Sequence, residues 1–226
     1  KILYKTAKHL GGLIMKYKNA YDLINKEYPI SIRSKFPAMI ERAYDAVAQI
    51  KESVEFLNWP LGDNLEGYLR NVAVGYQFKK MIENNQLPLK YRIALNKKKN
   101  YKYIEVLTDN AILTISQVQN KSSIPRYADY RTNHSLSNQL MFDIVDDLVE
   151  VKESPKYIIL TYGGPNDELE FVRLGVPEPY VSGWILQIDL YQELCQIVSE
   201  EETSEEEKLV DLKQYLKNEV LKIDKV

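Results

Sequence analysis

The N-terminal third of the chain repeats apolar residues at alternating spacings of three and four positions, the pattern of helices that pack at a shallow angle. This spacing predicts helices over residues 1–28, 35–57 and 64–84. Gly11-Gly12 interrupt the first helix, Pro29 ends it, and Ser34 is placed to cap the second. Because the connections are short, we expect the helices to pack antiparallel as a small bundle or layer, with a self-dimerising coiled coil as the alternative.

After Pro88 the apolar period falls to two, which indicates strands. Residues 90–95, 101–107 and 111–118 alternate and are separated by turn signals, which predicts a three-stranded antiparallel meander. Further strands are expected at 157–162 and 169–174, and residues 184–190 fit either a strand or the start of a helix. Residues 119–136 are predicted to be a loop and residues 137–148 a short helix.

The C-terminal end combines an acidic run with an amphipathic pattern. Glutamates dominate residues 200–207, and a helix is predicted over residues 205–223, where Ser204 and Glu207 match a capping box. The expected fold class is therefore α+β. We expect a helical region at 1–87, an antiparallel sheet region with a short helix at 88–199, and the acidic linker and amphipathic helix at 200–226, together forming one compact domain.

Composition limits the class of protein further. The chain is 45% hydrophobic and 27% charged, as globular proteins are, and its apolar runs are too short to span a membrane. Residues 1–102 hold 19 Lys and Arg against 9 Asp and Glu, whereas residues 103–226 hold 11 against 23. This asymmetry suggests an interaction role, although the two halves could also face each other or pair between subunits. With one cysteine and no visible export signal, a cytoplasmic location is expected, and abundant Lys, Asn, Ile and Tyr are typical of AT-rich bacteria or their phages.

Several catalytic classes do not fit the residue inventory. Cys195, His9 and His134 are the only cysteine and histidines, too few for a structural zinc site. The chain contains no glycine motif for phosphates or dinucleotides and no nucleophile elbow. Cys195 lies in a largely apolar run, so we expect it to be a small core residue.

A Mg²⁺-dependent nuclease is the enzymatic alternative. The predicted order α-β-β-β-α-β resembles the core order of the PD-(D/E)xK nuclease superfamily, whose sites place an Asp and a Glu-x-Lys on neighbouring strands. The resemblance implies that acids hold Mg²⁺ while the lysine helps position the attacking water. The third meander strand, however, ends in Gln117-Val118-Gln119 where Glu-x-Lys is expected. The candidate catalytic residues are Asp146, Asp147, Glu150 and Lys152.

Two segments carry residue types that bind macromolecules. Residues 126–134 interleave arginine with tyrosine, and residues 96–100 place lysines at a predicted hairpin tip. The alternatives are that residues 126–134 form a loop with paired arginine and aspartate that lies across the sheet, and that the lysine tip is simply solvated. The candidate binding residues are Lys97, Lys98, Lys99, Arg126, Tyr127, Tyr130 and Arg131.

These observations favour a non-enzymatic binding protein, regulatory or involved in phage–host conflict. Its expected partner is nucleic acid or an acidic protein surface, with no membrane partner, metal site or cofactor. Mg²⁺ enters only under the nuclease alternative. A second alternative is a homo-oligomeric assembly protein that pairs through its heptad-patterned helices.

Overall fold

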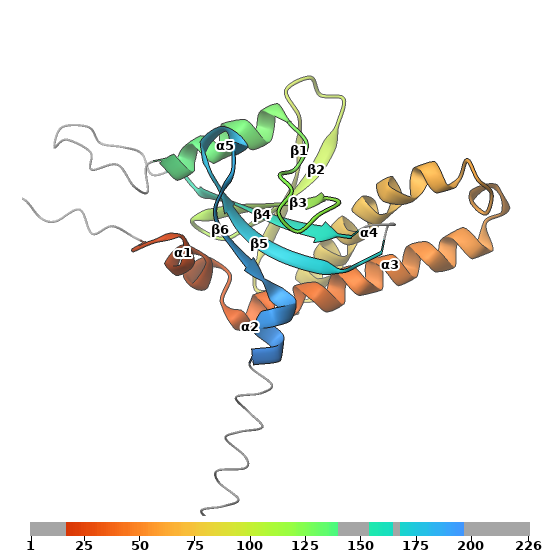
Figure 1. Ribbon diagram of the computed structural model, residues 1–226, viewed down its shortest axis with the longest axis horizontal. Helices are drawn as coiled ribbons and strands as arrows, with labels where there is room; N and C mark the ends of the chain where they lie inside the picture. The colour runs from red at the N-terminus through yellow and green to blue at the C-terminus, as the bar shows by residue number, and fades with distance from the viewer. Residues whose placement is uncertain (1–16, 140–153, 165–167, 197–226) are drawn as a thin grey trace, which may run out of the picture.

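The computed structural model describes residues 17–139, 154–164 and 168–196, and it arranges them as a mixed sheet with helices on both faces (Figure 1). The α+β class is confirmed. The helices are α1 (Ala20–Glu27), α2 (Ile30–Arg33), α3 (Phe36–Ser53), α4 (Asp63–Glu83) and α5 (Asp129–Gln139), with 3₁₀ turns η1 (Glu55–Leu57) and η3 (Pro179–Val181). The strands, which neighbour one another in chain order, are β1 (Lys90–Leu95), β2 (Lys102–Leu107), β3 (Ala111–Gln117), β4 (Lys156–Gly163), β5 (Phe171–Pro177) and β6 (Trp184–Asp189).

Helices α3 and α4 form an antiparallel pair that covers one face of the sheet and extends beyond it at its connecting end (Figure 1). Phe36 and Phe78 are fully buried between the pair and the sheet, with their ring centroids 5.0 Å apart. The helix predicted over residues 64–84 is confirmed. The helix predicted over residues 35–57 ends at Ser53 and is followed by η1.

Two details of the N-terminal prediction are wrong. Ser34 does not cap α3, because its own backbone is helical and its N–H donates to the Ile30 carbonyl at 3.0 Å, so it closes α2 instead. The described part of the helix predicted over residues 1–28 begins only at Ala20, where the side chain of Asn19 accepts a hydrogen bond from the Asp22 N–H at 2.8 Å. Gly11-Gly12 lie outside the described residues.

The three-stranded meander is confirmed, and β4, β5 and β6 are antiparallel neighbours. The expectation of an antiparallel sheet is wrong at one pair, since β3 runs parallel to β4, from Ala111 opposite Lys156 to Gln117 opposite Tyr162. Parallel strands need a long crossover, and α5 lies in the connection between them. The connection that contains α5 is therefore long enough to allow the parallel pairing.

Strand β2 pairs with β1 along its whole length but with β3 only from Glu105 to Leu107. From Glu105 toward its tip, the β1–β2 hairpin bends away from β3, as Figure 1 shows. This divergence leaves a space bordered by the hairpin, β3 and α4.

Alternate strand positions point to opposite faces of the sheet, and the two faces differ in chemistry. The α3–α4 face is apolar and contributes Val106, Leu113, Ile158, Leu160 and Leu174 to the main core. The α5 face carries a small apolar cluster of Ile112, Tyr157 and Ile159 beside buried polar side chains, among them Glu105, Thr114, Ser116 and Thr161.

Several predictions beyond the meander are corrected or lie outside the described part. Residues 129–139 form α5, where the pattern predicts a loop over 119–136, and the helix expected over 137–148 is described only to residue 139. Residues 184–189 form β6, and a helical segment, 190–196, follows at once. The predicted C-terminal helix at 205–223 and the acidic run at 200–207 lie outside the described residues.

The helical segment 190–196 packs against α2 through an ion pair. Arg33 is 3% exposed, and its Nη2 and Nε donate to the carboxylate of Glu193 at 2.6 and 2.8 Å. Cys195, in the same segment, is exposed, so its expected core position is wrong. Among the described residues, no helix is both long and apolar enough to cross a bilayer.

Candidate functional site

The lysine segment predicted at residues 96–100 forms the tip of the β1–β2 hairpin. Lys97, Lys98 and Lys99 are exposed there, and Lys99 adopts a left-handed backbone conformation with φ 57°. The side chain of Asn96 holds the turn, because its Oδ1 accepts from the N–H groups of Asn100 at 3.0 Å and Tyr101 at 3.2 Å. The three ammonium groups are thus presented by an ordered turn.

A stack of tyrosines joins this hairpin to α5. The rings of Tyr103 on β2 and Tyr130 on α5 have centroids 3.8 Å apart and planes 17° from parallel. Tyr101, directly before β2, is near-parallel to Tyr103, with centroids 6.5 Å apart. Burial and the nearby Glu105 carboxylate raise the pKa of Tyr103, so its hydroxyl is protonated at neutral pH. The stack brings the two sequence-predicted segments to one end of the molecule.

The four predicted residues at the start of α5 divide into two pairs. Arg126 and Tyr127 are exposed, Tyr127 to 80%, and the Tyr127 hydroxyl donates to Asp129 at 2.7 Å. Tyr130 and Arg131 are half-buried, and Arg131 donates to the Arg126 carbonyl at 2.7 Å and to the Ser116 hydroxyl at 3.3 Å. Arg126 and Tyr127 are therefore available to a partner, whereas Tyr130 and Arg131 are held against the rest of the protein.

A buried carboxylate lies directly beneath this surface, and sequence reasoning does not select it. Glu105 is 1% exposed, accepts a hydrogen bond from Arg92 Nε at 2.5 Å and shares one with His134 Nε2 at 2.9 Å. Burial works against the charged carboxylate, but the hydrogen bonds from His134 and Arg92 outweigh it and hold the pKa of Glu105 below its ordinary value. Glu105 therefore ties β1, β2 and α5 together.

A signal for Glu105 is present in the sequence. It alternates in phase with Tyr101, Tyr103 and Leu107, so it is a charged residue on an otherwise aromatic and apolar side of a strand. The register then places Arg92 opposite Glu105 across β1 and β2. Spacing alone does not assign His134 to this pair, because His134 comes from α5.

The far end of α5 is anchored by a buried amide. The Nδ2 of Asn138 donates to the carbonyls of Tyr157 at 2.9 Å and Pro177 at 3.0 Å, and its Oδ1 accepts from the Tyr157 N–H at 2.9 Å. The Tyr157 hydroxyl in turn lies 2.6 Å from the Thr114 hydroxyl. Burial raises the pKa of Tyr157, which keeps this hydroxyl protonated.

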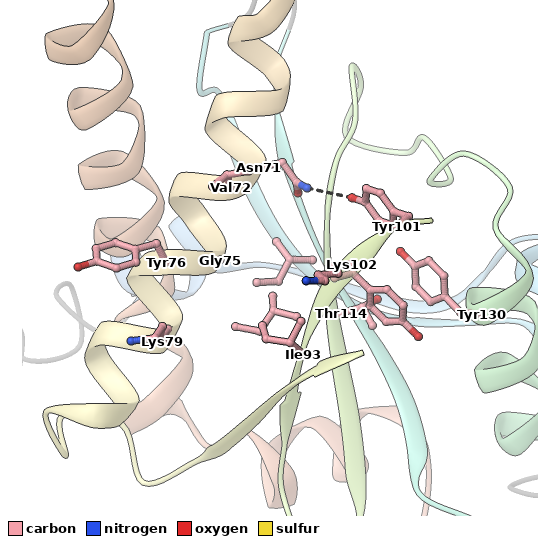
Figure 2. A pocket seen from close by; sticks show the side chains of 13 residues that line it. Asn71, Val72, Gly75, Tyr76, Lys79, Ile93, Tyr101, Lys102, Thr114 and Tyr130 are labelled. Carbon is pink, nitrogen blue, oxygen red and sulfur yellow. Dashed lines mark hydrogen bonds between the residues drawn. The ribbon is translucent and has the colours of Figure 1, made fainter. Parts of the chain in front are cut away.

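Where the hairpin leaves β3, the structure contains a hollow of about 220 Å³ (Figure 2). One wall is α4, which contributes Asn71, Val72 and Gly75, and the other is the diverging β2 and β3 with Tyr130 from α5. The Nδ2 of Asn71 donates to the Tyr101 hydroxyl at 3.3 Å, the dashed line in Figure 2. The tyrosine stack thus lies at the edge of a cavity that sequence reasoning does not foresee.

The nuclease alternative finds no site among the described residues. Strand β3, where Glu-x-Lys is expected, has neither an acidic residue nor a lysine. In residues 17–139, 154–164 and 168–196 no group of three or more His, Cys, Asp or Glu side chains is placed to hold a metal ion. The candidates Asp146, Asp147, Glu150 and Lys152 lie outside the described residues, so this alternative stays a prediction.

Comparisons with protein-family models, with curated proteins and with solved structures give no match. A function is therefore proposed from the geometry and charge of the molecule itself.

Proposed function

We propose that this protein binds nucleic acid through the end of the molecule at which the β1–β2 hairpin meets α5. The contact between Tyr103 and Tyr130, 3.8 Å between centroids, carries the proposal, because it joins the lysine hairpin and the arginine–tyrosine segment into one surface. We call it the basic aromatic surface. It comprises Arg92, Lys97, Lys98, Lys99, Tyr101, Lys102, Tyr103, Arg126, Tyr127, Tyr130 and Arg131.

The charge of the basic aromatic surface supports a polyanionic partner. Seven of its residues are lysine or arginine. Two carboxylates that neighbour these residues are already engaged, since Glu105 is buried with Arg92 and His134, and Asp129 accepts from the Tyr127 hydroxyl. Neutralising phosphates with such cations releases counterions, which supplies most of the affinity of non-specific nucleic-acid binding.

The aromatic groups favour nucleic acid over an acidic protein. Lysine and arginine attract either partner, but tyrosine rings add an interaction that bases can satisfy through stacking. Tyr127 is 80% exposed and Tyr101 is 39% exposed, so both are accessible beside the cations. An acidic protein would also be attracted by the charges, and the comparison with polyglutamate below distinguishes the two partners.

The test is fluorescence-polarisation binding of labelled DNA and RNA oligonucleotides at low and moderate salt, in EDTA. We expect Lys97→Ala, Lys98→Ala and Lys99→Ala, combined in one variant, to weaken binding and to flatten its salt dependence. The log–log slope should fall by about 0.7 to 0.9 for each phosphate that the variant no longer neutralises. A matched control combines Lys18→Ala, Lys80→Ala and Lys90→Ala, which removes the same charge from exposed lysines away from the hairpin tip.

Three outcomes would overturn the proposal. Absence of binding to every oligonucleotide at low salt would do so, and so would equal losses of affinity in the two triple variants. Binding of polyglutamate as tight as that of DNA would identify an acidic protein surface as the partner class instead. Replacing EDTA with Mg²⁺ tests the nuclease alternative separately, because cleavage that Glu150→Gln abolishes would support it.

A further inference from the structure

The two outer strands of the sheet differ in what lies beside them. Strand β6 forms one edge, and helix α1 contacts it, whereas β1 forms the other edge and pairs with β2 alone. Natural edges are commonly blocked by proline, a bulge or free charges. Strand β1 has neither a proline nor a register shift, and its two cations, Lys90 and Arg92, are already paired with Asp109 and Glu105.

The hydrogen-bond pattern shows which backbone groups of β1 face this open edge. The Asn96 N–H donates to the Tyr101 carbonyl at 3.0 Å, which makes these two residues a hydrogen-bonded pair of the hairpin. In antiparallel strands such pairs alternate with positions whose N–H and C=O groups point away from the neighbour. The register therefore turns the backbone groups of Tyr91, Ile93 and Leu95 away from β2, and within the described part of the chain no backbone hydrogen bond reaches them.

The side chains at these positions continue an apolar surface onto α4. Ile93 pairs with Ile104 of the main core, which places the Ile93 side chain on the α3–α4 face. It lines the hollow of about 220 Å³ together with Val72 and Tyr76 (Figure 2). Val72, Tyr76, Ile93 and Leu95 are 48% to 58% exposed. A contiguous apolar surface of this kind marks an interaction site.

Strand β1 is complementary to itself. Two copies of β1 that pair antiparallel in one sheet are related by a two-fold axis perpendicular to the sheet, and such an interface uses the same surface twice. With the axis at Ile93, the two Ile93 residues lie opposite each other, and Tyr91 of one copy lies opposite Leu95 of the other. The outward-facing backbone groups of both copies then pair, and the β1 side chains that meet on the α3–α4 face are all apolar.

The charges of β1 are compatible with this register. Arg92 lies opposite Ala94 of the second copy, and Lys90 lies opposite Asn96, so no like charges oppose each other. An axis at Arg92 would instead set two guanidinium groups against each other. The charge pattern therefore selects Ile93 over Arg92 as the centre.

The size of the surface favours a second copy over an extended peptide. Six strand residues span about 20 Å, and such an edge alone covers less than the ~800 Å² per partner of a standard interface. The two-fold axis places both α4 helices on the same face of the joined sheet, one on each side of the axis. Val72 and Tyr76, which share the hollow with Ile93, then lie beside it. A peptide strand would pair with the edge but brings no helix to cover them.

We infer that two copies of this chain associate through β1, paired antiparallel about a two-fold axis at Ile93, so that their two sheets become one. This inference does not depend on the nucleic-acid binding proposed above. The same rotation places both α5 faces on one side of the joined sheet, so the dimer offers its two basic aromatic surfaces on that side.

Sedimentation velocity of the full chain over a range of concentrations tests the association, and we expect a dimer. Ile93→Lys should raise the dimer dissociation constant by about tenfold or more, because two ammonium groups then meet at the axis. Ile93→Pro should act in the same direction, since β2 does not use the Ile93 N–H and a proline there removes only bonds to the partner. The matched control is Ile50→Lys, at a 47% exposed isoleucine on α3, which should stay within about twofold of the parent.

A cross-link tests the register. In a Cys195→Ser background, which removes an exposed thiol, Ile93→Cys should form a disulfide-linked dimer when oxidised with diamide. Hydrogen-bonded antiparallel neighbours have Cα atoms ~5.5 Å apart, within the reach of a disulfide. Leu95→Cys is the control, because the two copies of Leu95 lie four residues out of register, ~13 Å apart along the strands.

Three results would overturn the inference. One is a monomer at every concentration, and another is a dimer whose dissociation constant neither Ile93 variant changes. The third is cross-linking of Leu95→Cys as readily as Ile93→Cys. A monomer whose Ile93 amide is protected from hydrogen exchange would identify another segment of the same chain as the occupant of the edge. Oligonucleotide binding is measured separately, so either proposal can fail while the other stands.

Discussion

Both faces of the sheet bury side chains beneath helices, but different interactions hold them there. On the α3–α4 face, side chains such as Leu113, Leu160 and Phe78 are fully buried among other apolar groups. On the α5 face, Glu105 and Asn138 are equally buried, and each is held by hydrogen bonds to more than one element.

The two faces therefore contribute differently: the apolar face mainly to the stability of the fold, and the polar face mainly to the position of α5. Apolar packing is non-directional, and its contribution follows the area removed from water. Hydrogen bonds are directional and contribute less net stability, but they fix where α5 and its Tyr130 lie relative to β2. We therefore expect substitutions on the α3–α4 face to change the free energy of unfolding most, and those on the α5 face to change the basic aromatic surface most.

The largest effect is expected for Phe78→Ala on the α3–α4 face. Phe78 is fully buried and packs edge-on against Phe36, so its replacement leaves a cavity and should lower the free energy of unfolding by about 3–5 kcal/mol. Urea denaturation measures this change. Leu65→Ala on the same helix is the control, because Leu65 is exposed and should cost within about 0.5 kcal/mol. Similar decreases in the two variants would contradict the assignment of the core.

A smaller effect is expected for Asn138→Ala on the α5 face. The substitution leaves the buried Tyr157 N–H and the Pro177 carbonyl without the amide, which should lower the free energy of unfolding by about 1–3 kcal/mol. Hydrogen exchange should show faster opening of α5 than of α3 or α4. Asn133→Ala, at an exposed position of α5, should leave both measurements unchanged. An equal loss of hydrogen-exchange protection in α3, α4 and α5 would show that α5 does not open independently of the α3–α4 pair.

The smallest effect concerns the pH dependence contributed by Glu105. Its pKa in the folded protein lies below the ordinary value of 4.5, so its contribution to stability is present above that value and is lost as the pH falls through the folded pKa. Unfolding followed from neutral pH to below 4.5 should therefore show a steeper decrease of stability in the parent than in Glu105→Gln. Parallel curves for the two proteins would show that the carboxylate is not held by Arg92 and His134 as the structure has it.

Elements with a clear apolar period can be predicted from the sequence, and elements held by polar contacts cannot. Helix α4 and strands β1, β2 and β3 have regular patterns, which predict their bounds to within one or two residues. Helix α5 has the sequence DYRTNHSLSNQ, which has no apolar stripe and therefore fits a loop. It is a helix in the structure because Asn138, His134 and Arg131 hydrogen-bond to three different strands or their ends, and such distant partners leave no periodic signal.

The candidate site divides in the same way. The exposed positions of the hairpin lysines and of Arg126 and Tyr127 follow from local composition, because polar residues in a turn or loop are normally solvated. The sequence pattern assigns Tyr101 and Tyr103 to a strand but does not identify them as binding residues. The contacts that hold their rings come from Tyr130 on α5 and Asn71 on α4, which are distant in the sequence.

Local sequence was enough for strands β1 to β5, most of the long helices and the basic character of the hairpin, because periodicity, turn residues and charge act over a few neighbouring positions. The parallel pairing of β3 with β4, the ion-paired burial of Glu105 and the meeting of the two tyrosine-bearing segments emerged only from the folded chain. Those features depend on contacts between residues tens of positions apart, and their register is selected by the packing of the whole sheet.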